Sequence, residues 1–179
     1  MFSHRLDETT DLRLLEIRHA PALFTLVDRQ RPYLREWLPW VDETQSYVNT
    51  ATFIANSRQQ FADGRGFQAG IFLDDALVGV IGFHDINHVH RFTSIGYWLS
   101  SDVQGRGIMT RACRALVQHA LVDLGLNRVE IRAAVENCKS RAIPERLGFE
   151  LEGAIRQAEW LHDHFVDHAV YGMLARDWR

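Results

Sequence analysis

Gln104-Gly-Arg-Gly-Ile-Met109 joins a strand pattern to a helix pattern through two glycines. Before it, Phe92–Leu99 alternates as a strand does, and after it an apolar stripe runs at helical spacing from Ile108 to Leu124. A helix start leaves backbone N–H groups unpaired and carries positive partial charge, and glycines let an anion come close to them. The stretch therefore indicates either a phosphate-binding loop or a turn that simply needs glycine.

The tripeptide Gly-Arg-Gly also occurs at Gly64–Gly66, in a different setting. There it follows a predicted helix and precedes a strand, so a glycine that ends the helix is the favoured interpretation. The spacing after Gly105 excludes the familiar nucleotide loops. A dinucleotide fingerprint needs a third glycine where Thr110 stands, and the triphosphate loop needs Gly-Lys-Ser/Thr, which the chain lacks.

Length and charge narrow the functional classes. The chain has 179 residues, 46% of them hydrophobic and 24% charged, and this predicts one domain, residues 1–179, with one sizeable core. A formal net charge of -3, from 20 Lys+Arg against 23 Asp+Glu, argues against a broad nucleic-acid surface. However, residues 103–122 contain no Asp or Glu but hold Arg106, Arg111 and Arg114, which suits an anionic ligand at one helix start.

Nothing in the sequence predicts export or a membrane span. The first residues lack an apolar core, and the longest apolar run, Leu77–Phe83, is far shorter than the ~20 residues of a spanning helix. Cys113 and Cys138 are too few for a disulfide framework and lack zinc-motif spacing. We expect a cytoplasmic protein in a reducing compartment, with Cys113 buried in the helix after the glycine loop.

The remaining patterns predict an α/β domain with a mixed sheet. Short spacings between three strands in the middle of the chain indicate an antiparallel meander, and a pair of strands closes the chain. The expected strands are Leu12–Ile17, Phe67–Leu73, Ala76–His84, Phe92–Leu99, Arg128–Val135, Glu150–Arg156 and Val166–Leu174. The expected helices are Ala22–Asp28 after Pro21, a helix capped by Thr44 or Ser46 that ends at Asp63, a helix from Gly107 to Leu124, and Ser140–Leu147.

Three blocks of the sequence resemble the Gcn5-related N-acetyltransferase family. Gln104–Met109 is similar to that family's Gln/Arg-x-x-Gly-x-Gly/Ala loop, although Met109 stands where glycine or alanine is usual. Val135-Glu-Asn-Cys-Lys-Ser140, followed by Glu145-Arg-Leu-Gly-Phe149, resembles the family's distal region. Gly96-Tyr-Trp-Leu99 resembles the strand along which the pantetheine lies.

The resemblance extends over residues 12–171. It is closest to the subgroup that acetylates ribosomal-protein N-termini, the ribosomal-protein-serine and -alanine acetyltransferases. It implies a single domain whose mostly antiparallel mixed sheet is flanked by helices and has a splayed central strand pair. It also implies that acetyl-coenzyme A (acetyl-CoA) is bound through its pyrophosphate, and that an amine attacks the thioester directly in a ternary complex.

The resemblance places the donor on particular residues of this chain. The implied cofactor-binding residues are Trp98, Leu99, Gln104, Gly105, Arg106, Gly107, Ile108, Met109, Thr110 and Asn137. A backbone N–H near Trp98 or Leu99 would polarise the acetyl carbonyl. Arg106 and Arg111 could add charge-assisted bonds to phosphates, or be solvated charges on a helix face. Asn137 could bond the pantetheine or simply brace its loop.

Two catalytic residues are implied by the same resemblance. Ser140 would protonate the leaving thiolate, although a serine that precedes a helix could equally cap it. Glu159 matches a segment where related enzymes carry a proposed base, but a carboxylate needs burial to raise its pKa for this role, and most glutamates are surface charges. His84, Asp85 and a water chain are the alternatives for the base. Cys138 has no activating partner that would mark it as a nucleophile.

The histidines could suggest a metal site. His88-Val-His90 and His162-Asp-His164 are close pairs, and His168 follows four residues after the second. None stands at zinc-finger spacing and neither cysteine is near them in sequence, so we expect loop or surface histidines and no metal.

The acceptor is the least constrained part of the hypothesis. Subgroup likeness implies a ribosomal-protein N-terminus; the alternative is a small amine such as a polyamine or aminoglycoside, which acidic residues in the channel would favour. Tyr33, Trp37 and Trp40 could line that channel or pack between the first two helices, and we expect packing for Trp37. A non-catalytic acyl-CoA binder is a third reading, which the presence of Ser140 and Asn137 disfavours. The resemblance also implies a homodimer, in which the closing strands could pair across subunits, whereas charge and composition predict no nucleic-acid or membrane partner.

Overall fold

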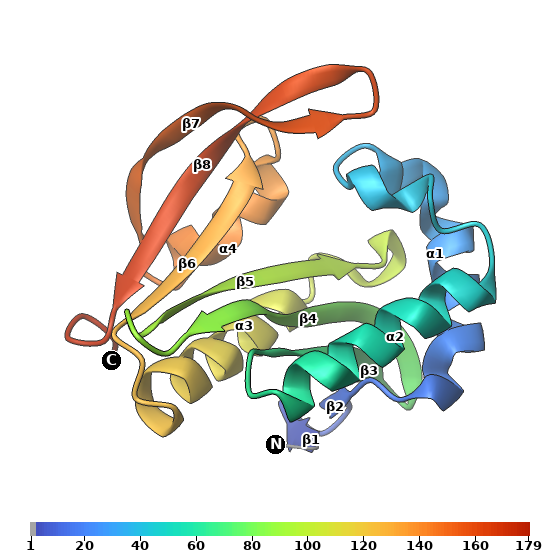
Figure 1. Ribbon diagram of the computed structural model, residues 1–179, viewed down its shortest axis with the longest axis horizontal. Coiled ribbons are helices and arrows are strands. Elements are labelled where there is room, and N and C mark those ends of the chain that lie inside the picture. Colours follow the sequence, from blue (N-terminus) through green and yellow to red (C-terminus); the bar gives the residue numbers. More distant parts are fainter. Residues whose placement is uncertain (1–2) are drawn as a thin grey trace.

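The strands on both sides of the glycine loop belong to one eight-stranded sheet in the computed structural model, which describes residues 3–179 (Figure 1). The order is β1-β2-β3-β4-β5-β6-β8-β7, and the β5–β6 pair is parallel whereas the other neighbours are antiparallel.

The strands are β1 Ser3–Arg5, β2 Thr10–Leu14, β3 Phe67–Leu73, β4 Ala76–Asn87, β5 Phe92–Leu99, β6 Arg128–Ala134, β7 Glu150–Leu161 and β8 His164–Leu174. The α-helices are α1 Ala20–Arg35, α2 Tyr47–Ala62, α3 Ile108–Gln118 and α4 Cys138–Arg146, with short 3-10 turns η1 Ile17–His19, η2 Pro39–Val41 and η3 Ser101–Val103, and a π-helical turn η4 His119–Asp123. The predicted mixed, mostly antiparallel sheet with flanking helices is confirmed.

The central strands β5 and β6 pair only where Phe92–Ser94 faces Arg128–Glu130, and then they separate. This is the splayed pair that the family resemblance implied. On the other side of β5, the backbone N–H of Ser100 donates to the carbonyl of Val78 at 2.8 Å. Alternate residues of a strand bond to opposite neighbours, so Tyr97 and Leu99 turn their backbone groups toward the gap.

Two apolar clusters hold helices on opposite faces of the sheet (Figure 1). Ile81 of β4 is fully buried in the larger cluster, which includes Leu116 of α3. Its neighbour Val80 points the other way, into the cluster formed with α1 and α2. The sheet is therefore covered by α3 and α4 behind and by α1 and α2 in front, as Figure 1 is oriented.

Local sequence signals predicted the ends of several strands and helices correctly. Strands β3 and β5 have the predicted bounds, and Ser46 precedes α2, where Asn49 Oδ1 accepts a hydrogen bond from the Ser46 backbone N–H at 3.0 Å. Gly64 has a φ of +68° just after α2, which confirms that the first Gly-Arg-Gly ends a helix. Within residues 3–179, no helix is long and apolar enough to cross a membrane.

The prediction for the first helix was too short. Helix α1 continues through Pro32, although a proline inside a helix removes one backbone hydrogen bond. Leu34 lies beyond the proline and is buried in the front cluster with Leu23 and Val27 of the same helix. This burial offsets the lost bond, so tertiary packing extends the helix past its local stop signal.

The start of α4 also differs from the prediction. Asn137 caps the helix, and its Oδ1 accepts a hydrogen bond from the Ser140 backbone N–H at 3.0 Å. Ser140, which we considered as the cap, instead lies in the first turn. Its hydroxyl is therefore not used for capping.

The closing strands are longer than predicted and form a hairpin that curves over the open end of the sheet (Figure 1). A bulge lies between Ile155 and Glu159, where the Gln157 backbone N–H donates to the Asp167 carboxylate at 2.8 Å. At the tip, His162 Nε2 is 2.8 Å from the Arg35 carbonyl oxygen and Nδ1 is 3.2 Å from the Asp42 carboxylate. These contacts join the hairpin to the end of α1.

The two cysteines predict a clear difference in reactivity. Cys113 is buried in the core as expected, and burial raises the pKa of its thiol to about 12, whereas Cys138 is exposed. A colorimetric disulfide reagent should therefore modify one thiol in the native protein at pH 8 and both after unfolding. The variant Cys138→Ser should lose the native reaction, and a fast native reaction in that variant would contradict the packing described for α3.

Candidate functional site

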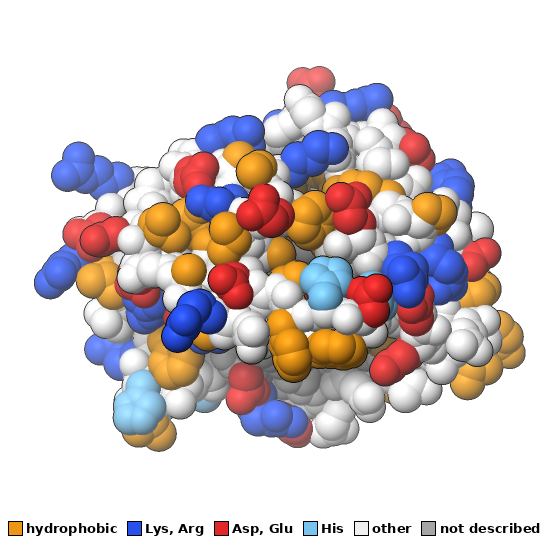
Figure 2. Space-filling model, turned by 90° about the horizontal axis from the view of Figure 1, so that it is seen from above, with side chains coloured by type: hydrophobic (Ala, Val, Ile, Leu, Met, Phe, Trp, Pro, Cys, Tyr) orange, Lys and Arg blue, Asp and Glu red, His pale blue; other side chains and the backbone are white. Residues whose placement is uncertain are grey.

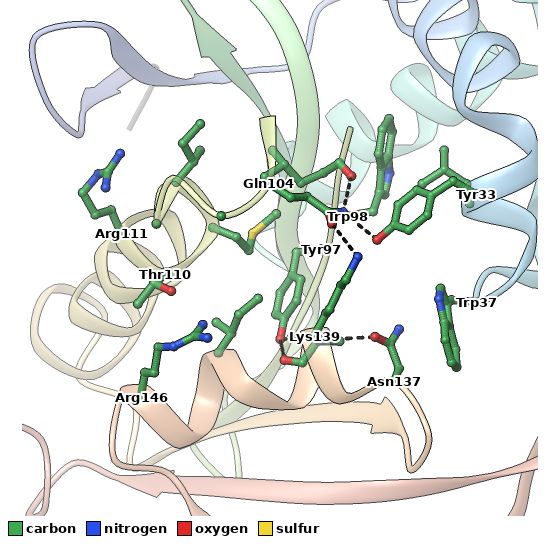
Figure 3. A pocket seen from close by; sticks show the side chains of 18 of the residues that line it. Tyr33, Trp37, Tyr97, Trp98, Gln104, Thr110, Arg111, Asn137, Lys139 and Arg146 are labelled. Carbon is green, nitrogen blue, oxygen red and sulfur yellow. Dashed lines mark hydrogen bonds between the residues drawn. The ribbon is translucent and has the colours of Figure 1, made fainter. Parts of the chain in front are cut away.

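A cavity of about 830 Å³ opens where β5 and β6 separate. Four segments form its walls: the end of α1, strand β5, the glycine loop with the start of α3, and α4 (Figure 3). The lining residues are Tyr33, Leu34, Trp37, Leu38, Tyr97, Trp98, Leu99, Gln104, Gly105, Gly107, Ile108, Met109, Thr110, Arg111, Asn137, Lys139, Ser140, Ile143 and Arg146.

The glycine loop has the geometry of an anion site. Gly105 and Gly107 have φ values of +76° and +70°, which L-amino acids with a side chain rarely adopt. Nothing lies within 4 Å of a Cβ built on Gly105, so a ligand can approach its backbone. Gly107 is the N-cap of α3, and the first turn of that helix has no acidic residue. The unpaired N–H groups and the helix dipole therefore face the cavity without a competing charge.

Arg111 adds a cation beside the loop. Its Nη2 is 2.9 Å from the Asp7 carboxylate, and its Nη1 donates to the Arg106 carbonyl at 3.1 Å. The buried Nε has no hydrogen-bond partner among the described residues. Arg146 and Lys139 also line the cavity. Three cations and a helix start fit a ligand that carries phosphate groups.

A hydroxyl pair lies in the middle of the cavity. Tyr97 Oη donates to the Ser140 carbonyl at 3.0 Å, and the Ser140 hydroxyl oxygen is 3.4 Å from Tyr97 Oη. Burial raises the pKa of Tyr97, so the phenol keeps its proton. Arg141 holds α4 in place by donating to the Tyr171 hydroxyl at 2.9 Å and to the Val135 carbonyl at 2.7 Å.

A polar network closes one side of the cavity. The Gln104 side-chain amide donates to the Tyr33 hydroxyl at 2.6 Å, and its oxygen accepts a bond from Lys139 Nζ at 3.3 Å (Figure 3). The network links α1, the glycine loop and α4, which are distant in sequence. Neither Lys139 nor Tyr33 was predicted as a donor-site residue.

The aromatic residues in and after α1 differ from our expectation in which of them line the cavity and which pack against other side chains. Trp37 lines the cavity, so the prediction that it packs in the core was wrong. Trp40 instead packs against Trp98, with ring centroids 6.2 Å apart. Helix α1 ends at Arg35, and a turn in which the Trp37 N–H donates to the Leu34 carbonyl at 3.1 Å follows it, so Tyr33 and Trp37 both line the cavity.

Most of the predicted site residues come together in this cavity. The structure gathers Trp98, Leu99, Gln104, Gly105, Gly107, Ile108, Met109, Thr110, Asn137 and Ser140, whereas Arg106 and Glu159 do not line it. Sequence reasoning missed Tyr97, Lys139 and Arg146. A usable signal existed for Arg146, since Ser140, Ile143 and Arg146 recur at a spacing that puts them on one face of α4.

Glu159 and the histidines have other partners. Glu159 Oε2 lies 3.3 Å from His168 Nε2 on the hairpin. His88 Nε2 is 2.8 Å from the Gly64 carbonyl oxygen, and His164 Nδ1 is 2.7 Å from the Asp163 carboxylate. In the part of the chain from residue 3 to residue 179, no three His, Cys, Asp or Glu side chains converge as metal ligands would.

A mixed sheet that splays beside a glycine loop at a helix start is the architecture of an acyltransferase that uses coenzyme A (CoA). A family model described as an acetyltransferase (GNAT) domain matches residues 10–150, and the chain belongs to this family. The family uses acetyl-CoA as the acetyl donor.

Two individual relatives indicate which kind of acetyltransferase this chain is. The chain is 40% identical to YdaF of Bacillus subtilis (strain 168), over 99% of this chain and 98% of that one. It is 31% identical to the ribosomal-protein-serine acetyltransferase of Escherichia coli (strain K12), over 95% of both chains. The enzyme is thus an N-acetyltransferase of the ribosomal-protein acetyltransferase type.

Solved structures agree with this assignment. The ribosomal alpha-N-protein acetyltransferase RimL, in complex with CoA, has a TM-score of 0.92 and 30% identity, covering 95% of this chain and 96% of that one. The microcin C7 self immunity acetyltransferase MccE, in complex with acetyl-CoA and AMP, has a TM-score of 0.90 and 28% identity, covering 94% of each chain.

The loop geometry predicts the effect of a single methyl group on CoA binding. In Gly107→Ala the new Cβ would lie 3.0 Å from Arg111 Nη1, and its left-handed backbone would cost about 1–2 kcal/mol. The dissociation constant for CoA, measured by calorimetry, should rise by about tenfold or more.

Gly125→Ala is the matched control. Gly125 also has a positive φ, +62°, with nothing within 4 Å of a built Cβ, and it does not line the cavity. Both variants should melt at lower temperature than the parent, but only Gly107→Ala should bind CoA more weakly. Equal CoA affinities in the two variants would contradict the role of the loop.

Proposed function

We propose that this enzyme transfers the acetyl group of acetyl-CoA to the N-terminal amine of a ribosomal protein, by direct attack in a ternary complex. The observation that carries the proposal is the continuous cavity, which runs from the glycine loop past Tyr97 and Ser140 to Trp37. A phosphate-binding end and an aromatic end suit two different substrates. The bound donor supplies an activated acetyl thioester, and residues of this chain supply the rest.

Donor binding is assigned to the loop and to the edge of β5. Backbone N–H groups from Gly105 to Thr110 would hold the pyrophosphate, and Arg111 and Arg146 would add charge-assisted bonds. The backbone groups of Tyr97 and the N–H of Leu99 face the gap beside β6, where they can bond the amides of the pantetheine, while the Leu99 carbonyl accepts from Gln104 Nε2 at 3.4 Å. An N–H of the same edge can polarise the acetyl carbonyl.

Ser140 is assigned the role of the general acid, which protonates the sulfur of CoA as it leaves. Its hydroxyl is free of capping and lies 3.4 Å from the Tyr97 hydroxyl, whose pKa is raised by burial. The Ser140 hydroxyl donates to Tyr97 Oη, and the Tyr97 hydroxyl donates to the Ser140 carbonyl, so Tyr97 holds the serine in place at the centre of the cavity.

The charge of the lining supports a peptide acceptor. Among the described residues, no Asp or Glu lines the cavity, and its acceptor end is formed by Tyr33, Leu34, Trp37 and Leu38. A polyamine or aminoglycoside carries several positive charges and would need acidic partners. A neutral, apolar wall instead suits the first residues of a protein chain with one amine. A ribosomal protein acceptor would place the enzyme in the cytoplasm.

The acceptor can be tested with purified components. Ribosomal proteins from a strain that lacks this enzyme are incubated with acetyl-CoA and the protein, and intact-mass spectrometry follows each chain. One or a few proteins should gain one acetyl group at the N-terminus. Transfer only to spermidine, an aminoglycoside or a nucleotide-linked amine, run in parallel, would establish the small-amine alternative and contradict the ribosomal one.

Ser140→Ala is the control that ties this activity to the cavity. The variant should bind CoA normally but acetylate the same N-terminus at least about 100-fold more slowly, as expected for loss of a general acid. CoA binding without turnover on any amine, in the parent protein, would instead identify a non-catalytic binder.

We also propose that the protein forms a homodimer through the outer edge of β7. Among residues 3–179 this strand has no neighbour on its outer side, and Leu151 and Ile155 are exposed on it. Figure 2 views the molecule from the side of the hairpin, where hydrophobic side chains emerge between charged ones of both signs. An uncovered strand edge of this length favours pairing with another strand.

Sedimentation gives the test of the dimer. The parent protein should sediment at twice the mass of 20.7 kDa, and Leu151→Glu, which places a charge on the pairing edge, should sediment as a monomer. Glu43→Gln, an exposed change outside β7, is expected to leave the mass unchanged. A monomeric parent at micromolar concentration would refute the proposal.

A further inference from the structure

A second, small cavity of about 100 Å³ lies in the gap between β5 and β6. Its walls include His84 of β4, Ser94, Gly96 and Tyr97 of β5, Arg132 of β6 and Ser140 of α4. Tyr97 and Ser140 line the large cavity as well. The two cavities therefore have these two residues as common walls.

The fold aims His84 into this small cavity. The β4–β5 pairing shifts register between Phe83 and Ile86, and such a bulge re-aims the side chain at that point of a strand. His84 Nδ1 is 3.0 Å from the Ser94 hydroxyl oxygen. Its Nε2 lies over Gly96, so close that a Cβ built there would be 2.5 Å away. Gly96 thus leaves the space that the imidazole occupies.

The surroundings of His84 favour its neutral form. His84 is exposed on its outer side, but burial of its inner side against the sheet lowers its pKa, and the positive charge of Arg132 lowers it further. The other charged neighbours point elsewhere: Asp85 is 3.6 Å from Arg65, and Arg132 itself bonds Glu130 at 2.6 Å. Tyr97 remains an uncharged phenol, because burial raises its pKa. If Nδ1 donates to Ser94, the lone pair is on Nε2, above Gly96.

We propose that His84 Nε2 is the base that takes the proton from the acceptor amine, and that Ser94 positions the ring. This inference rests on the proposed function and adds a catalytic residue to it. The amine nitrogen gives one proton to His84 and forms the new C–N bond with its electron pair. The C–S bond breaks with its electron pair on sulfur, which takes one proton from Ser140. One proton lost and one gained balance the transfer, and solvent then exchanges with both groups.

The location of Glu159 supports this choice of base. Its carboxylate is 3.3 Å from His168 Nε2, and it lines neither cavity. A base must lie within hydrogen-bonding reach of the amine, or one water away. Of the two candidates, only His84 borders the space that Tyr97 and Ser140 share.

Matched variants separate the two bases. His84→Gln keeps a polar side chain that can bond Ser94 but cannot take a proton near neutral pH, and Glu159→Gln removes only the carboxylate charge. With the acceptor identified above, kcat of His84→Gln should fall by about 100-fold or more, while CoA affinity and KM for the donor stay close to the parent values. Glu159→Gln should retain most of the parent activity. Full activity in His84→Gln together with loss in Glu159→Gln would overturn the proposal.

The pH profile gives a second readout. A base works in its neutral form, so kcat/KM of the parent should fall as pH drops through the pKa of His84, below its ordinary value of about 6.5. Glu159→Gln should keep this acid limb, whereas His84→Gln should lose it. An unchanged acid limb in His84→Gln would count against the imidazole.

Nitrogen NMR of the histidine rings tests the proposal without turnover. The signal that disappears in His84→Gln belongs to His84, and at pH 7 it should report a neutral ring protonated on Nδ1. Ser94→Ala should shift the ring toward the other tautomer and lower kcat without abolishing it. A His84 ring that is charged at pH 7, or protonated on Nε2, would refute its assignment as the base. This result does not depend on turnover. Failure to acetylate any acceptor would instead refute the proposed function.

Discussion

The short parallel contact between β5 and β6 determines the rest of the site. The strands pair from Phe92 to Ser94 and then diverge, so backbone groups on both edges lose the partners that a continuous sheet would supply. A buried strand edge is unfavourable unless something bonds to it. The gap therefore creates a binding surface for an amide-rich ligand and leaves room for both cavities beside Tyr97.

Structural elements that depend on residues close in the sequence could be predicted from the sequence alone. The meander strands β3 and β5, the cap at Ser46 and the two Gly-Arg-Gly stretches all follow from turn chemistry and periodicity. The glycine loop carried the family resemblance as well, because a close approach of an anion needs glycine at fixed positions. For this reason most of the residues that the resemblance implied for donor binding line one cavity, although which of them bind the donor stays a prediction.

Elements that depend on distant contacts could not be read in this way. Helix α1 passes through Pro32 because Leu34 has a place in the front core, and Asn137 caps α4 in place of Ser140. Lys139 is drawn to the cavity by Gln104, a residue that no local pattern connects to it. The residues that line the two cavities come from α1, β4, β5, β6 and α4, so only the assembled fold shows that these distant segments lie close together.

The contact of His162 with Arg35 joins residues that are 127 positions apart in the chain, and the neighbouring contact with Asp42 spans nearly as much. Closing a loop of that length costs entropy that only many other native contacts can offset, so such a contact forms late in folding. Helix α3 and its glycine loop, in contrast, rest mainly on contacts with nearby strands. During synthesis, α3 and the glycine loop can thus pack on β4 and β5 before the hairpin exists. The contacts that join the end of α1 to the hairpin form only after the last strands leave the ribosome.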